Sequence, residues 1–288
     1  MPTPRAAAIH DLSGFGRCSL TVAIPILSVM GIQCCPLPTA FLSTHTGGFQ
    51  NFTFLDMTEE IPRVAAHWES LALHFQAIYS GFLGSEQQIG MVADFIQRFR
   101  KPDTVVVVDP VMGDDGRLYQ TYTPAMCVGM RRLSALADII TPNLTEAALL
   151  LDLDYADLPG VGRPCDEAGL RRLTEALSLD GQRSVALTGA SLAPGMTGAI
   201  CFDARSGKTK AVQTDFVAHP LHGTGDVFAS VLTGALMQGK SLRDAAAQAV
   251  DFIHACALRT VAQDLPLREG VDFEPLLGLL APSGGNGR

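Results

Sequence analysis

The feature of this sequence that most constrains its fold is a repeated alternation of short β-rich runs with helical patterns. The run Val105–Val108, four consecutive valines followed by Asp109, is apolar on both alternations, as a parallel strand covered on both faces must be. This strand–helix rhythm is typical of βαβ units. The sequence therefore predicts an α/β fold, a three-layer α/β/α sandwich around a mostly parallel sheet.

The same patterns predict where the elements lie. We expect strands near residues 6–10, 33–42, 77–82, 104–109 and 139–141, and helices near residues 19–30, 58–73, 85–99, 123–135 and 144–151. After Asp180, short runs joined by Gly-bearing turns favour an antiparallel edge at residues 184–188, 198–203 and 209–214. Two long helical patterns follow at 225–238 and 241–264. We expect a single domain over residues 1–280, a surface loop at 160–164 and a flexible C-terminal tail at 281–288.

The composition is that of a globular protein. Of the 288 residues 47% are hydrophobic and only 17% are charged, which excludes a disordered, collagen-like or coiled-coil chain. The net charge is −8 with no run of Lys or Arg, so that we expect no nucleic-acid partner. The cysteines form no CxxC pair, no secretory signal is visible, and the uncharged stretch 18–42 is interrupted by prolines. We therefore expect a cytoplasmic protein that does not bind membranes.

Polar and Gly-rich segments follow the predicted strands, where ligands bind in open parallel sheets. The clearest is His222-Gly223-Thr224-Gly225-Asp226, directly before a helical pattern. Its glycines let the backbone approach a ligand, and the first N–H groups of the helix can hold an anion. Asp226 is then placed to remove a proton from an attacking hydroxyl while the backbone stabilises charge on a phosphoryl group. The structural alternative is a Gly turn with an Asp favoured by the helix dipole.

Two further strand ends carry acidic residues that suit Mg²⁺. Asn143 and Glu146, in TPNLTEA, form a predicted capping box, and at a strand end the pair can also orient Mg²⁺ through water. Asp109 ends the valine run, where a carboxylate is costly unless a cation or hydrogen bonds meet it. An ordinary turn-capping Asp is the alternative at this position. Asp114 and Asp115, in the loop that follows, are expected to be solvated.

Other motifs are weak or absent. The segment GFGRCS at 14–19 nearly matches the dinucleotide fingerprint GxGxxG, but it lacks the third glycine, and no Asp or Glu lies between Asp11 and Asp56. The Walker pattern and the GxSxG elbow are absent. The polar segment 43–49 suits a lid, although a plain surface connection is the alternative. His219 and His222 are not expected to bind a metal, because Pro220 lies between them.

These motifs, in this order, resemble the ribokinase-type superfamily of small-molecule kinases, and specifically its pyridoxal/pyridoxamine kinase branch. The resemblance extends from Ile9 to about Val261 and is carried by PLPTAFLSTHTGGF, YSGFLGS, DPVMG, TPNLTEA and HGTGDVFAS. It implies a ribokinase-like fold and the ATP- and Mg²⁺-dependent phosphorylation of the 5′-hydroxymethyl group of a B6 vitamer (pyridoxal, pyridoxamine or pyridoxine). It also implies a homodimer, the common state in that branch. Members of the branch often use K⁺ as well.

The resemblance assigns a role to each matched residue. Asp226 matches the catalytic base, and the anion hole is matched by Gly223, Thr224 and Gly225. Asp109 and Glu146 match the acidic residues around Mg²⁺. ATP would be bound by Asn143, Thr188, Gly189, His222, Gly223 and Thr224. The substrate would be bound by Asp11, Ser13, Thr46, Phe82 and Asp226, with Phe82 standing where the family often carries Tyr.

One departure from the family pattern concerns the substrate. Many pyridoxal kinases carry Ser where this chain has Asp11, and a carboxylate there can pair with a protonated ring nitrogen or an amine. This favours pyridoxamine or an aminopyrimidine over the aldehyde. Hydroxymethylpyrimidine kinase of the thiamin pathway is therefore an alternative, although that family usually has Cys where Asp226 stands. A non-catalytic ligand-binding protein on the same fold is the alternative from another class.

Overall fold

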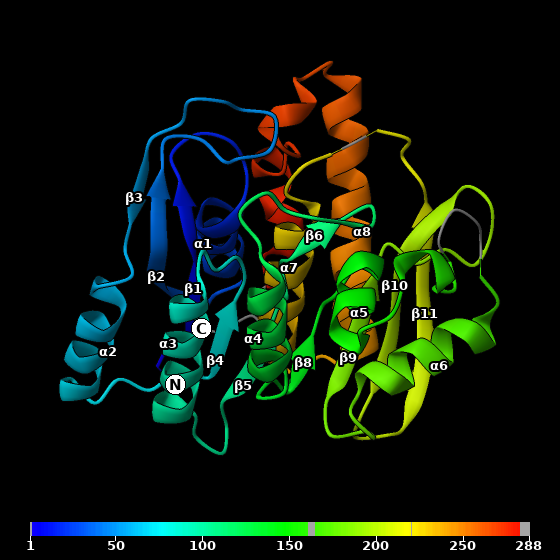
Figure 1. Cartoon of the computed structure of the whole chain (residues 1–288). Helices are drawn as coiled ribbons and strands as arrows, with labels where there is room; N and C mark the ends of the chain where they lie inside the picture. Colours follow the sequence, from blue (N-terminus) through cyan, green and yellow to red (C-terminus); the bar gives the residue numbers. More distant parts are fainter. Residues whose placement is uncertain (1, 161–164, 220, 283–288) are drawn as a thin grey trace, which may run out of the picture.

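A computed structural model describes residues 2–160, 165–219 and 221–282, and these residues build a nine-stranded sheet in the order β11-β10-β9-β8-β5-β4-β1-β2-β3 (Figure 1). Six strands run parallel, namely β1 (Arg5–Ser13), β2 (Gln33–Leu42), β4 (Ala77–Ser80), β5 (Val105–Val108), β8 (Ile139–Ile140) and β9 (Ser184–Thr188). At the two edges the pairing is antiparallel: β3 (Phe54–Asp56) pairs with β2, and β10 (Met196–Asp203) pairs with both β9 and the edge strand β11 (Lys208–Asp215). The mostly parallel sheet with an antiparallel edge is confirmed.

Helices cover both faces of the sheet, which confirms the three layers (Figure 1). One face is covered by α1 (Ser19–Val29), α7 (Thr224–Met237) and α8 (Leu242–Ala262). The other is covered by α2 (Glu60–Ser70), α3 (Glu86–Phe99), α4 (Pro124–Ser134), α5 (Leu144–Leu151) and α6 (Glu167–Leu177). In the described residues no helix is long and apolar enough to span a bilayer.

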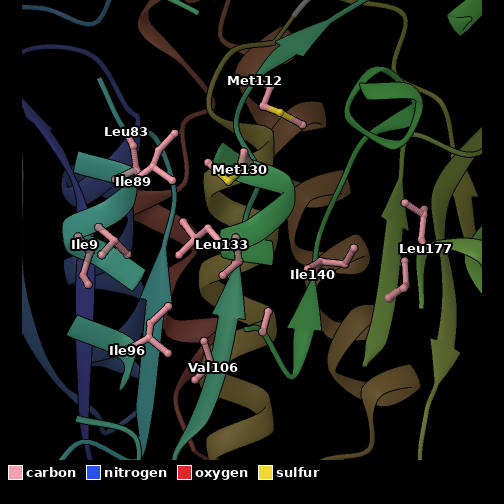
Figure 2. Packing of buried hydrophobic residues seen from close by; sticks show 14 of the residues in the cluster. Ile9, Leu83, Ile89, Ile96, Val106, Met112, Met130, Leu133, Ile140 and Leu177 are labelled. Atoms are coloured by element: carbon pink, nitrogen blue, oxygen red, sulfur yellow. The ribbon is translucent and has the colours of Figure 1, made fainter. Parts of the chain in front are cut away.

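The core explains why the central strands are apolar on both alternations. In β5, Val106 and Val108 face the α3–α4 layer, whereas Val107 faces α1 and α7. Figure 2 shows Val106 in its cluster with Ile9 of β1, Ile96 of α3 and Leu133 of α4. Burial of such side chains contributes about 1.5–3 kcal/mol each. The first acidic side chain after this run is therefore Asp109, directly beyond the end of β5.

Several helix starts follow their sequence signals. The side chains of Ser85, Thr123, Asp166 and Ser241 each accept a hydrogen bond from a first-turn backbone N–H group of α3, α4, α6 and α8, respectively. Asn143 and Glu146 form the predicted capping box of α5. Such caps stabilise a helix by about 1 kcal/mol each.

Four elements escaped prediction from the sequence. Three are strands of only two or three residues, β3 and the hairpin of β6 (Gly113–Asp114) and β7 (Arg117–Leu118), which are too short to show a period. The fourth is the amphipathic helix α6. Short 3₁₀ turns occur at Tyr155–Asp157, Leu267–Glu269 and Glu274–Leu280. The predicted loop at 160–164 and tail at 281–288 lie mostly outside the described residues.

Candidate active site

A cavity of about 460 Å³ opens at the carboxyl ends of the parallel strands, beside the start of α7. It is lined by ten of the residues singled out in the sequence, namely Asp109, Asn143, Glu146, Thr188, Gly189, His222, Gly223, Thr224, Gly225 and Asp226. These residues come from the ends of β5, β8 and β9 and from the first turn of α7. The topology thus gathers segments that lie over 100 positions apart in the sequence into one place.

The start of α7 presents backbone N–H groups to this cavity. Gly223, at the N-cap, has φ 77, a left-handed conformation that favours glycine. Thr224, Gly225 and Asp226 form the first turn, whose N–H groups have no partner within the helix. This arrangement is suited to bind an anion such as a phosphoryl group.

Asp226 lies in this turn, half-buried, with its carboxylate accepting a hydrogen bond from the Ser19 backbone N–H group. Desolvation raises the pKa of Asp226 to about 7, the nearby charge of Asp11 adds to the rise, and the Ser19 bond opposes it. A carboxylate whose pKa lies near neutral pH is an effective general base.

Ser19 connects Asp226 to the predicted substrate side. It has φ 51, an uncommon conformation for a residue other than glycine, and this orients its N–H group toward Asp226 while its hydroxyl donates to Asp11 Oδ1 at 2.5 Å. Ser13 Oγ donates to the other oxygen, Asp11 Oδ2, at 3.0 Å. The two carboxylates are thus held by the same residue at the start of α1.

Asp109 and Glu146 form an acidic wall of the cavity. Both are buried, desolvation raises the pKa of each, and each is raised further by a neighbouring carboxylate, Asp226 for Asp109 and Asp109 for Glu146. Asp109 Oδ1 accepts from Thr141 Oγ1 at 2.8 Å, and Glu146 accepts from the N–H groups of Asn143 (2.9 Å) and Met112 (3.2 Å). Such a pair is suited to a bound cation, which would offset the cost of the two buried charges.

No group of three or more His, Cys, Asp or Glu side chains in the described residues could by itself hold a metal ion. The two carboxylates nevertheless fit Mg²⁺, because that ion commonly keeps several waters and is bound through one or two carboxylates together with substrate phosphates. Asp109 is the freer of the two, since both oxygens of Glu146 already accept backbone N–H groups.

The predicted nucleotide residues lie along the cavity toward β9. Asn143 Nδ2 donates to the Gly113 carbonyl oxygen at 2.9 Å, which fixes the side chain. Gly189 has φ 71, and a β-carbon there would meet no atom within 4 Å, so that the backbone is open to a ligand. Farther out, the cavity is a slot between β10–β11 and α8, lined by Thr197, Thr214, Val250, Ile253, His254 and Ala257.

The four other predicted substrate residues do not line this cavity. Asp11 and Ser13 are buried in β1, and Phe82 is half-buried after β4. Thr46 is exposed in the loop after β2. Next to it, His45 Nε2 lies 2.7 Å from the Arg268 carbonyl oxygen, and Gly47 N–H donates to His45 Nδ1, so that His45 fixes this loop against the C-terminal turn.

The comparisons with known proteins agree with this geometry. The sequence pattern of the family described as phosphomethylpyrimidine kinase matches residues 24–270. The chain belongs to this family. It is 33% identical over 256 residues to the thiamine biosynthesis bifunctional protein ThiED of Geobacter sulfurreducens, covering 88% of this chain and 49% of that protein. The chain thus spans about half the length of that relative.

Solved structures of similar proteins share the fold over nearly the whole chain. A candidate phosphomethylpyrimidine kinase of Bacteroides thetaiotaomicron, crystallised with pyridoxal, is 43% identical with a TM-score of 0.90, covering 96% of each chain. The pyridoxal kinase of Lactobacillus plantarum is 31% identical with a TM-score of 0.87, again covering 96% of each chain. The ribokinase-like fold and the resemblance to the pyridoxal and hydroxymethylpyrimidine kinases are therefore confirmed.

Sequence reasoning missed several residues of this candidate site. Asp114 is exposed, as expected, but it also lines the cavity, and partial desolvation together with the charge of Asp115 raises its pKa. Tyr119 lines the cavity too. Ser19, whose backbone N–H group bonds Asp226, has a left-handed φ that no sequence pattern predicts. Thr141, by contrast, lies in the TPNLTEA motif, and its strand-end position was a usable signal for its contact with Asp109.

Proposed function

We propose that this kinase transfers the γ-phosphoryl group of ATP to the hydroxymethyl group of a small heteroaromatic acceptor, with Asp226 as the general base. The observation that carries the proposal is the position of Asp226. Asp226 lies in the first turn of α7, whose open N–H groups can hold a phosphoryl group. Its carboxylate accepts from the backbone of Ser19, whose hydroxyl group donates to Asp11. An acceptor hydroxyl placed there would lose its proton to Asp226 as it attacks phosphorus, while the α7 N–H groups stabilise the developing charge.

We propose a B6 vitamer as the acceptor, phosphorylated on its 5′-hydroxymethyl group. Pyridoxal in the structure of the Bacteroides relative, at 43% identity, supports this assignment. So does the pyridoxal kinase of Lactobacillus plantarum at 31% identity. The carboxylate at position 226 also supports it, because the hydroxymethylpyrimidine kinases usually carry Cys there. Asp11, Ser13, Thr46 and Phe82 would contact the ring and its substituents.

Hydroxymethylpyrimidine is the second candidate acceptor, and it is supported almost equally well. The family is described as phosphomethylpyrimidine kinase, and the Geobacter relative is a thiamine biosynthesis protein. Asp11 adds a physical reason, since its carboxylate can pair with an aminopyrimidine as well as with pyridoxamine.

ATP and Mg²⁺ belong to this proposal. Mg²⁺ would be held by Asp109 and Glu146 together with the nucleotide phosphates, and when bound it would neutralise phosphate charge. Asn143, Thr188, Gly189 and His222 would contact the nucleotide, whose base would enter the slot beside α8. The K⁺ requirement, the homodimer, the single domain and the cytoplasmic location stay predictions.

The experiment that tests the proposal measures ADP release from Mg·ATP with each of several acceptors and with none. The panel contains pyridoxal, pyridoxamine, pyridoxine, hydroxymethylpyrimidine and a sugar. Turnover with a B6 vitamer at the highest kcat/KM is the expected result. Turnover with the pyrimidine alone would establish the second candidate. No turnover with any acceptor, with ATP still bound, would overturn the kinase assignment in favour of a non-catalytic binding protein.

A further inference from the structure

Three segments that border the candidate site are hydrogen-bonded to one short turn after α8, Arg268–Val271, which we call the C-terminal turn. Its carbonyl groups accept from His45 Nε2 at 2.7 Å and from the Arg17 N–H group at 2.9 Å. Its last N–H group donates to the His222 carbonyl oxygen at 3.3 Å. Four consecutive residues thus hold the loop after β2, the segment before α1 and the segment before α7.

The His45 ring forms a hydrogen bond at each of its nitrogens. Burial lowers the pKa of His45, so that the ring is neutral at pH 7. Since Nδ1 accepts from the Gly47 N–H group at 3.1 Å, the ring proton is on Nε2, which donates to the Arg268 carbonyl oxygen. The first bond closes a turn around Thr46, whose side chain is exposed. His45 therefore shapes the loop that carries Thr46 and also anchors it.

The same ring packs closely against the start of α1 and against a residue of the cavity. A β-carbon on Gly16 would lie 2.3 Å from His45 Cδ2, so that this glycine makes room for the imidazole. A β-carbon on Gly47 would lie 3.1 Å from His222 Cε1, and the centroids of the His45 and His222 rings are 5.6 Å apart. Because His222 lines the cavity, the loop after β2 supports the cavity wall from behind.

Phe49 adds a second contact between this loop and the C-terminal turn. The Arg268 guanidinium group lies 5.2 Å from the centroid of the Phe49 ring, and Phe49 meets the His45 ring edge to face at 5.0 Å. Arg268 is exposed, and a cation–π contact is weak where water competes for the cation. His45 is only 8% exposed, so that its hydrogen bond is the stronger of the two links.

We propose that His45 is a positioning residue of the reaction, which holds the loop with Thr46 in place through the bond from its Nε2 to the C-terminal turn. The same turn holds the start of α7, so that the loop and Asp226 keep a fixed separation. An acceptor bound by the loop then presents its hydroxyl group to Asp226. The inference rests on the proposed function, since it assigns His45 to the acceptor side of that site.

The test uses two variants that separate the two bonds of the ring. The side-chain amide nitrogen of His45→Gln is as many bonds from Cα as Nε2 is, so that it can donate to the Arg268 carbonyl oxygen. The side-chain oxygen of His45→Asn is as many bonds from Cα as Nδ1 is, so that it can accept from Gly47 but does not reach the C-terminal turn. The acceptor kcat/KM should fall by about 10- to 100-fold in His45→Asn, the usual effect of a displacement of about 1 Å. His45→Gln should restore most of this loss.

Thr104→Val is the matched control, because Thr104 makes the same pair of bonds at the opposite end of β5 from Asp109. Its Oγ1 donates to the Phe75 carbonyl oxygen at 2.7 Å and accepts from the Lys101 N–H group at 3.1 Å, the same distances as at His45. Thr104 is 6% exposed. Thr104→Val should lower the Tm about as much as His45→Asn does and leave kcat/KM unchanged.

A second measurement does not depend on turnover. Amide hydrogen exchange is followed by mass spectrometry in the peptide that covers residues 43–53. Without its anchor the loop should open more often, so that exchange in His45→Asn should be about two- to tenfold faster, the effect of one lost hydrogen bond. His45→Gln and Thr104→Val should exchange this peptide at nearly the rate of the unchanged protein.

The two measurements separate the inference from the proposed function. If the unchanged protein phosphorylates no acceptor, the proposed function fails, and the exchange series alone decides whether His45 anchors the loop. An unchanged kcat/KM in His45→Asn, or equal losses in the Asn and Gln variants, would overturn the inference while the kinase assignment stands. Lower kcat/KM and faster exchange in His45→Asn, both largely restored in His45→Gln, would establish it.

Discussion

Gly223 lies so close to Arg17 that a β-carbon on residue 223 would stand 2.2 Å from the Arg17 carbonyl oxygen. The Arg17 side chain is itself anchored, because its guanidinium group forms ion pairs with Asp272 at 3.0 Å and Glu274 at 2.8 Å. The start of α7 is therefore fixed against the segment that leads into α1. This contact joins the predicted anion hole to the residues that hold Asp226 and Asp11.

The first prediction concerns Gly223→Ala. The added methyl group would displace backbone rather than a flexible side chain, and φ 77 would add strain. Since a displacement of about 1 Å at a reacting group can cost about 10²-fold, we expect kcat/KM to fall by about that factor. Gly239→Ala is the matched control, because residue 239 has φ 85 but an added methyl group there would meet no atom within 4 Å. It should cost about 1–2 kcal/mol of stability and no activity. Equal activity losses in the two variants would contradict the contact.

The second prediction concerns Asp226→Asn, which keeps the shape of the side chain and removes the base. We expect kcat to fall by about 10²–10⁴-fold, the usual contribution of a general base, while the ATP Kd changes little. Asp251→Asn, at an exposed position of α8, should leave both unchanged. The measurements are steady-state ADP release and a nucleotide titration. Turnover of the Asn variant within a few-fold of the unchanged protein would exclude Asp226 as the base.

The third prediction concerns pH. Asp226 must be ionised to accept a proton, and burial raises its pKa to about 7. The acceptor kcat/KM should therefore rise about tenfold per pH unit below pH 7 and level off above it, since this ratio reports the free enzyme. Measurement between pH 5 and pH 9 checks this. A flat profile over pH 5–7 would mean that the base titrates elsewhere.

The fold and half of the site were predictable for identifiable reasons. The valine run of β5 and the caps at Asn143 and Ser241 are local signals, and their structural consequences are local as well. The rule that ligands bind beyond the carboxyl ends of parallel strands then predicted that Asp109, Glu146 and Asp226 lie at one site. This prediction needed no information on long-range contacts. The rest depends on contacts between distant segments. Nothing near Ser19 in the sequence indicates a left-handed φ, and nothing near Arg17 indicates that its carbonyl group lies against Gly223.

The fourth prediction concerns Asp109→Asn in the absence of metal and nucleotide. The raised pKa of Asp109 means that its ionised form is disfavoured in the folded state, so that stability is lost as the pH rises toward that pKa. Asn removes this cost and can still accept from Thr141 Oγ1. We expect a higher Tm for the Asn variant, with the gain increasing from pH 6 to pH 9.

The same variant should lose function. Asp109→Asn should raise the Mg²⁺ concentration needed for half-maximal turnover by about tenfold or more, and chelation of Mg²⁺ should abolish turnover of the unchanged protein. Glu146→Gln should raise this Mg²⁺ concentration less, because the Glu146 oxygens already accept two backbone N–H groups and are less free to bind the ion. The Gln side chain also keeps an oxygen that can cap α5. If neither variant changes the Mg²⁺ dependence, Asp109 and Glu146 do not bind Mg²⁺.

The last prediction concerns Asp11, whose two oxygens accept from Ser13 and Ser19. Asp11→Ser removes a charge that can pair with an amine or a protonated ring nitrogen. The kcat/KM for pyridoxamine should therefore fall relative to that for pyridoxal by about tenfold, the contribution of one charge-assisted hydrogen bond. The negative charge of Asp11 also raises the pKa of Asp226, so that its removal should move the acid limb to lower pH.

These two effects of Asp11→Ser are separable. Ser13→Ala keeps the Asp11 carboxylate and removes only one of its hydrogen bonds, and it should leave the order of acceptors unchanged. A shift of the acid limb without a change in relative kcat/KM would mean that Asp11 acts only on Asp226 through its charge. The choice of acceptor would then depend on the ring-contacting positions Thr46 and Phe82. A change in relative kcat/KM confined to Asp11→Ser would place the amine or ring nitrogen of the acceptor against this carboxylate.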